Sequence, residues 1–132
     1  MKGTVAALAV IVAAACATVA GIENQPLTAG QVRVYEAPLP RVVNATRIAL
    51  LGAALEIQSL RQLDPATWEF VAKRTHSGWT WGELVRVIAQ SSGARTTVYV
   101  VTKRRMAMNL TARGDWSEQI FAQIAADLLL NR

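Results

Sequence analysis

Few side chains in this sequence of 132 residues could carry out chemistry, and the first of them is a single histidine. His76 is followed by Ser77, and a serine activated by a histidine base is a common hydrolytic nucleophile. Adjacent residues in a turn rarely face each other with a third group to orient the base. We therefore interpret His76 as a solvated residue of a Ser/Gly turn at 75–78.

Two carboxylates are the next candidates. Glu69 and Glu83 flank the predicted turn, so they could meet across a hairpin in the way that glycoside hydrolysis requires. The pattern around them does not predict a pocket, which favours two solvated strand residues. A zinc site needs several converging ligands, which one histidine and Cys16 do not supply. The sequence therefore predicts no catalytic residue, metal or cofactor, with an exported enzyme of unrecognised active site as the alternative.

Cys16 is the only cysteine, and it lies inside a candidate export leader at 1–20. Lys2 precedes an uncharged apolar run, and small residues surround the cysteine, as in a cleavable signal. Ala15-Cys16 fits a lipoprotein signal, in which the cysteine is acylated and becomes the new N-terminus. Cleavage after Ala20 and an uncleaved anchor are the alternatives, although the apolar run is short for a spanning helix. All three predict export to a bacterial-type membrane or periplasm.

The formal net charge is +5, and the densest basic run is Lys103-Arg104-Arg105. Near an anionic membrane, each such charge adds about 1 kcal/mol of attraction, so the run is a candidate patch for lipid headgroups. The alternative is a strand end with solvated charges. Nucleic acid is not an expected partner, because stacking aromatic residues are not interleaved with the basic ones.

Four tryptophans divide into two groups. Trp68 and Trp116 fall on predicted core faces. Trp79 and Trp81 share one face of a predicted strand, where they could form a surface for a protein partner, because tryptophan is enriched at binding hot spots. The alternative for this second pair is another patch of core.

The apolar periodicity divides the rest of the chain into elements. A polar stretch with a proline and a glycine at 21–30 predicts a tether, and a single domain is expected at 31–132. Alternation predicts strands, and helical spacing predicts a helix before the second strand and another at the end, opened by Asp115 with Glu118 at capping-box distance. The predicted strands are 31–36, 56–63, 67–74, 79–90 and 94–103, and the first helix is 41–55.

Successive short turns between these strands require antiparallel pairing. A sheet of this size needs cover on one face, so both helices are expected to lie there. The sequence thus predicts an α+β fold: a two-layer sandwich of four to five antiparallel strands with two helices on one face, in the order β-α-β-β-β-β-α.

The chain also resembles the DUF3568 family of small bacterial lipoprotein-type domains. The resemblance is carried by the strand and turn residues at 32–39, the helix residues at 42–45 and 49–52, the residues at 55–57 that lead into the next strand, the hairpin at 75–78 and the leader cysteine. It implies location and fold, and it supplies no catalytic residues. We therefore expect a non-enzymatic envelope domain that binds protein, lipid or cell-wall material, with a carrier of a hydrophobic ligand as a further alternative.

Overall fold

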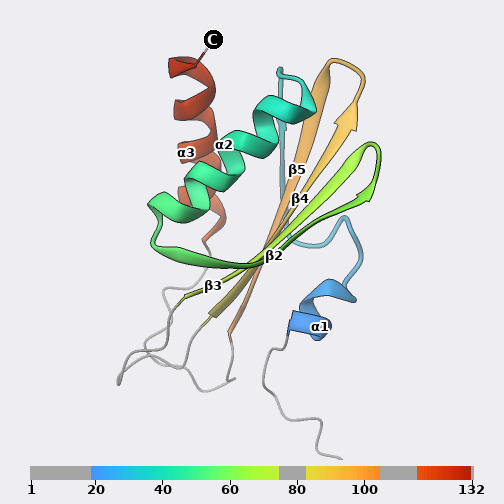
Figure 1. Cartoon of the computed structure of the whole chain (residues 1–132), viewed down its shortest axis with the longest axis vertical. Helices are drawn as coiled ribbons and strands as arrows, with labels where there is room; N and C mark the ends of the chain where they lie inside the picture. Colours follow the sequence, from blue (N-terminus) through green and yellow to red (C-terminus); the bar gives the residue numbers. More distant parts are fainter. Residues whose placement is uncertain (1–18, 75–82, 105–115, 132) are drawn as a thin grey trace, which may run out of the picture.

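The computed structural model describes residues 19–74, 83–104 and 116–131. Five antiparallel strands form one sheet in the order β1-β5-β4-β3-β2 (Figure 1). The strands are β1 (Gln31–Tyr35), β2 (Leu55–Asp64), β3 (Thr67–Arg74), β4 (Glu83–Ser92) and β5 (Arg95–Arg104), and the helices are α1 (Val19–Glu23), α2 (Leu39–Gly52) and α3 (Ser117–Leu130). The predicted α+β sandwich is confirmed, with five strands.

Strands β2 to β5 pair in chain order, because short connections join antiparallel neighbours. The exception is β1, which pairs with β5 at the far edge, where Gln31 lies opposite Val100. Two turns, at 65–66 and 93–94, lie at one end of the sheet. The end of β3, the start of β4 and the end of β5 lie together at the opposite end.

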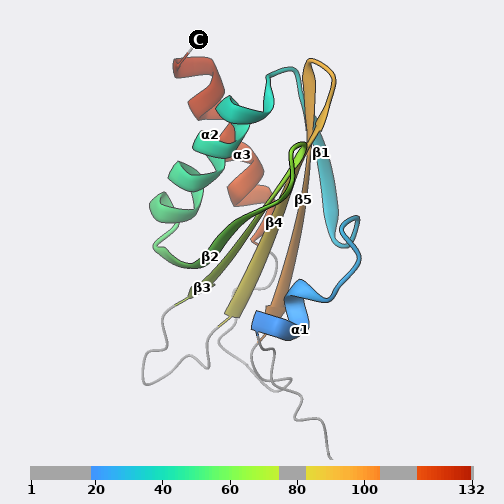
Figure 2. The same cartoon turned by 45° about the vertical axis from the view of Figure 1, so that its right-hand side comes forward.

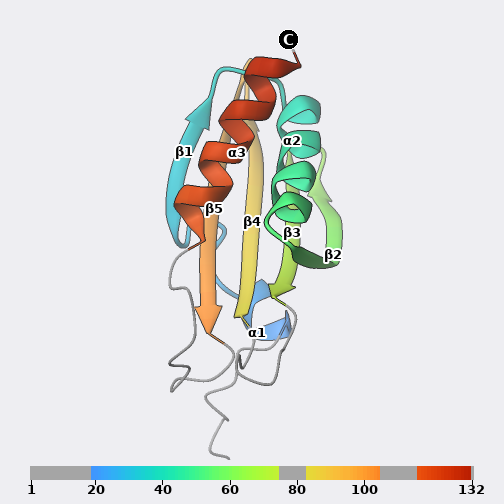
Figure 3. The same cartoon turned by 90° about the vertical axis from the view of Figure 1, so that its left-hand side faces the viewer.

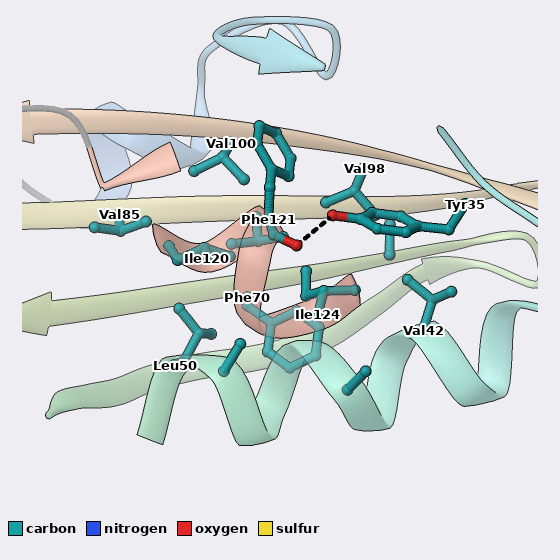
Figure 4. Close-up of a cluster of buried hydrophobic side chains, with 14 of the residues drawn as sticks. Tyr35, Val42, Leu50, Phe70, Val85, Val98, Val100, Ile120, Phe121 and Ile124 are labelled. Atoms are coloured by element: carbon teal, nitrogen blue, oxygen red, sulfur yellow. Dashed lines mark hydrogen bonds between the residues drawn. The ribbon is translucent and has the colours of Figure 1, made fainter. Parts of the chain in front are cut away.

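Helices α2 and α3 lie side by side over the same face of the sheet (Figure 3). The core fills the space beneath them, as Figure 4 shows for Phe70, Leu50 and Ile124. Fully burying an aliphatic or aromatic side chain contributes about 1.5–3 kcal/mol, so this layer supplies most of the stability. The strand residues that face it are every second one, such as Val85, Val87 and Ala89 of β4.

The helix starts differ from the predicted ones. Helix α2 begins at Leu39 rather than at residue 41, because Pro38 takes the extended N-cap conformation and Pro40 fits the first turn. The N-cap of α3 is Trp116, which makes no side-chain capping hydrogen bond. The predicted cap, Asp115, lies outside the described residues. Glu118 forms an ion pair with Arg33 across 3.3 Å.

The third helix, α1, lies on the face of the sheet opposite α2 and α3 (Figure 2). Ile22 is buried there among Val71, Leu84 and Val101. The buried guanidinium of Arg86 donates hydrogen bonds to three main-chain oxygens of this segment. They are Ile22 O at 3.0 Å, Gln25 O at 2.8 Å and Pro26 O at 2.6 Å. The predicted tether at 21–30 is therefore not free at residues 22–26, because a buried cation and an apolar contact fix them to the sheet.

Tyr35 joins the sheet to α3 through one buried hydrogen bond. Its hydroxyl donates to the main-chain oxygen of Phe121 at 3.0 Å (Figure 4). Burial raises the pKa of Tyr35 from 10.0 to about 12, against an opposing effect of the nearby Arg33. The neutral, hydrogen-bonded phenol is thus the form that the fold stabilises.

We expect Tyr35→Phe to lower the free energy of unfolding by about 1 kcal/mol at neutral pH, because one buried hydrogen bond is lost. The difference should shrink as the pH rises from 10 to about 12. Over this interval the unfolded tyrosine ionises and the folded one does not, so the wild type loses the stability that the raised pKa provides. Urea unfolding of both proteins across this pH range tests the prediction. A difference in unfolding free energy that stays constant with pH would contradict it.

Candidate functional site

A groove lies at the end of the sheet that carries the turns at 65–66 and 93–94. Its volume is about 620 Å³, which is within the range of sites that hold a ligand or a short segment of a partner. We call it the Trp68 groove. It is lined by Pro38, Leu39, Pro40, Val43, Gln62, Pro65, Ala66, Trp68, Ser91 and Gly93.

Three loops build this groove, and each is held in place locally. In the β2–β3 turn, the Asp64 carboxylate accepts a hydrogen bond from the main-chain N–H of Ala66 at 2.7 Å. The Ala66 carbonyl in turn accepts from the N–H of Ser91 at 2.7 Å, which ties this turn to the end of β4. Pro38 and Pro40 form the third wall at the start of α2, where their rings fix φ. The groove is therefore largely pre-formed.

The lining determines what the groove can do. Of the lining residues that the structure describes, seven are apolar or proline, and those with polar side chains are Gln62 and Ser91. None of these described residues carries a charge. Such a surface offers packing area, with the Trp68 ring as its largest element, and a few hydrogen bonds to orient what it holds. This composition suits binding.

A smaller hollow of about 340 Å³ lies between the end of β1, the start of α2 and the end of α3. Two polar side chains that line it form hydrogen bonds within the protein. Arg41 donates to the carbonyls of Leu128 at 3.0 Å and Asn131 at 3.1 Å, and the Tyr35 hydroxyl is bonded to Phe121. The guanidinium of Arg41 stabilises the C-terminal end of α3, where the helix dipole is negative. The bonds of Arg41 and Tyr35 indicate a structural role for this hollow.

The two candidate carboxylates, Glu69 and Glu83, do not meet. In β3 and β4 they lie on opposite faces of the sheet, because Val71 shares the α1 face with Glu69 and Val85 shares the helix-covered face with Glu83. The hypothesis of a carboxylate pair is therefore wrong. The interpretation as solvated residues is also wrong, because both side chains are buried.

Each buried carboxylate has a basic partner. Glu69 accepts a hydrogen bond from Nε of Arg61 at 2.6 Å, and this bond raises the pKa of Arg61. Glu83 accepts from Arg74 at 3.2 Å and from the indole N–H of Trp116 at 3.1 Å. These contacts fix β2 to β3 and the start of α3 to the sheet, so both carboxylates are structural.

The other residues predicted from the sequence are placed only in part. Cys16, His76, Trp79, Trp81 and Arg105 lie outside the described residues, so the predicted lipidation site and partner surface stay predictions. Lys103 is exposed near the end of β5, which ends at Arg104. Trp68 packs against the core, as expected, but it also lines the groove. Trp116 is buried in the core.

Neither metal binding nor a membrane-spanning helix is found in the part of the chain that the structure describes. Among those residues, no three histidine, cysteine or acidic side chains lie close enough to hold an ion. No described helix has the length and hydropathy to cross a bilayer. The sequence matches no model of a protein family and no curated protein.

Two features of the structure were not predicted from the sequence, the Trp68 groove and the buried Arg86. The sequence contains one indication of the groove, because Pro38, Pro40 and Pro65 flank predicted elements near Trp68. Local patterns do not show, however, that these loops meet. The sequence also contains an indication that Arg86 is buried, because it is the one charged residue within the apolar strand residues Leu84 to Ile88. A charge at such a position is seldom fully buried unless it has partners, and here the partners come from residues 22–26.

Proposed function

We propose that this protein is an exported, membrane-attached binding domain without enzymatic activity, as the resemblance to DUF3568 also suggests. Its ligand is an apolar segment of a partner protein of the cell envelope, held in the Trp68 groove. The chain is attached to the membrane through acylated Cys16. The candidate leader supports the location, and the groove supports the mode of action.

The observation that carries the proposal is the composition of the groove. Its walls present a half-buried tryptophan and three prolines on connections fixed by hydrogen bonds. Rigid apolar walls lose little conformational entropy when they bind, which favours affinity. The groove is open rather than enclosed, so a chain could pass through it, and Gln62 and Ser91 could bond its main chain. These features favour a polypeptide over a small carried molecule.

We expect Trp68→Ala to weaken binding of the partner segment by about tenfold or more, because truncating a hot-spot tryptophan typically costs 2 kcal/mol or more. The partner is found by placing a photo-crosslinking residue at Ser91 in the intact cell and sequencing the captured peptide. The affinity of that peptide for both proteins is then measured by calorimetry. Leu51→Ala is the matched control, because Leu51 is exposed on α2 and does not line the groove.

Three outcomes distinguish the alternatives. Equal affinity for the wild type and Trp68→Ala would remove the groove from the proposal. Equal capture from Ser91 and from the adjacent Ser92, which does not line the groove, would do the same. Recovery of a lipid or another small apolar molecule at Ser91 would replace the polypeptide by a carried ligand.

A further inference from the structure

The residues directly after the candidate leader are part of the folded domain. Ile22 is 1% exposed, and the Arg86 guanidinium bonds the carbonyls of Ile22, Gln25 and Pro26. In addition, an ion pair joins Glu23 of α1 to Arg61 of β2 at 3.4 Å. This part of the chain therefore does not act as a free spacer between a membrane anchor and the sheet.

The reach of the remaining chain is short. Val19, the first residue of α1, is three positions after Cys16, with two residues between them. A fully extended chain spans at most about 3.6 Å per residue, so this connection reaches about 10 Å. The same limit applies if the leader stays uncleaved as an anchor. In both cases α1 has to lie close to the bilayer surface.

The position of α1 determines which part of the domain faces that surface. Leu84, which contacts Ile22, is the second residue of β4, and it pairs with Lys73 of β3 and Lys103 of β5. These residues lie at the end of the sheet opposite the turns at 65–66 and 93–94, and Figures 1 and 2 show α1 at this end. We call it the base of the domain.

We propose that the base of the domain, formed by α1, Lys73, Leu84 and Lys103, docks on the surface of a bilayer that contains anionic lipid. The sheet then stands upright on the membrane, and the Trp68 groove faces away from it. This inference rests on the proposed membrane attachment and adds an orientation and a lipid contact to it.

The charges at the base are consistent with an anionic surface. Lys103 is exposed, and Lys73 is half-buried. Three acidic groups lie nearby: Glu23 of α1 pairs with Arg61, Glu83 is buried and bonded to Arg74, and Glu56 is opposite Lys73 in the β2–β3 register. Each of these carboxylates thus has a basic neighbour, which leaves exposed Lys103 as the excess positive charge among the described residues of the base.

Energy transfer to a labelled membrane tests this orientation. The acylated mature protein, which begins at Cys16, is reconstituted in vesicles of phosphatidylethanolamine and phosphatidylglycerol that carry a headgroup acceptor. Cys16 is blocked by acylation, so single donors can be attached to Glu56→Cys at the base and to Ser92→Cys near the opposite end. Along β4, Ser92 lies eight residues beyond Leu84, which corresponds to about 26 Å.

We expect transfer efficiency from the base position to exceed that from Ser92→Cys by about twofold or more, given this separation. Inserting about twelve glycine and serine residues between residues 17 and 18 should bring the two efficiencies together, because a flexible spacer frees the orientation. Equal efficiencies without the insertion, or stronger transfer from Ser92→Cys, would overturn the docking proposal alone. An intact mass without acyl chains and failure to associate with vesicles would overturn membrane attachment as well.

Discussion

Replacing Arg86 with methionine should lower the free energy of unfolding by about 3 kcal/mol or more and release residues 19–26 from the sheet. The reason is that the guanidinium serves three main-chain carbonyls at 2.6–3.0 Å. Methionine fills part of the space but donates no hydrogen bond, and a buried carbonyl without a partner costs about 1–3 kcal/mol. The same change also removes the positive charge that interacts with buried Glu69.

Burial lowers the pKa of Arg86, but arginine remains charged at any pH at which the protein is folded. The effect of Arg86→Met on stability should therefore be nearly independent of pH between about 5 and 9, unlike that of a titrating residue. Urea unfolding measures the loss. Cleavage after Glu23 by a glutamate-specific protease under native conditions measures the release of α1.

Arg95→Met is the matched control for this prediction. Arg95 is exposed, and it pairs at the surface with Glu36, which is also exposed. Exposed ion pairs contribute little, so this substitution should change stability by less than about 0.5 kcal/mol. Equal losses in the two variants, or resistance of the Arg86 variant to cleavage at Glu23, would contradict the role assigned to Arg86.

Gly30→Ala should also destabilise the protein by about 3 kcal/mol or more, because it combines backbone strain with a steric clash. Gly30 has φ of +92°, which L-residues rarely adopt. A Cβ at this position would lie 2.0 Å from the carbonyl oxygen of Val100. That oxygen belongs to β5, which is paired on both sides, so it cannot move away without disrupting the sheet.

Gly93→Ala separates the two contributions. Gly93 also has positive φ, at +66°, but a Cβ there would meet nothing within 4 Å. Its substitution should cost only the strain, about 1–2 kcal/mol. Thermal and urea unfolding of the two variants test this order. A smaller loss of stability for Gly30→Ala than for Gly93→Ala would show that the β5 backbone can shift to accommodate a side chain at residue 30.

The fold was largely predictable because its signals are local. Alternating residues such as Trp68, Phe70 and Ala72 determine which face of β3 is buried, and glycine-containing or proline-containing turns specify the antiparallel pairing of β2 to β5. The pairing of β1 with β5 could not be predicted in the same way. Residues 31 and 100 are far apart in sequence, and the alternation of apolar and polar residues in either strand does not indicate which strand it pairs with.

The site was less predictable, since it depends on contacts between distant segments. Ile22 follows the candidate leader and lies in a polar stretch without periodicity, so its burial becomes visible only when Val71, Leu84 and Val101 are brought together. Likewise, Pro38 and Trp68 are separated by a helix and a strand in sequence. A local pattern predicts each element, whereas a groove depends on how the elements are packed.

The place of β1 at the edge of the sheet has a consequence for the order of folding. The strands β2 to β5 can assemble early by closing short loops, but β1 has to wait for residues 96–100, because these are its partners. During synthesis from the N-terminus, the first strand to leave the ribosome is thus among the last to pair. We expect the segment that precedes it to stay accessible to translocation and processing enzymes throughout that interval.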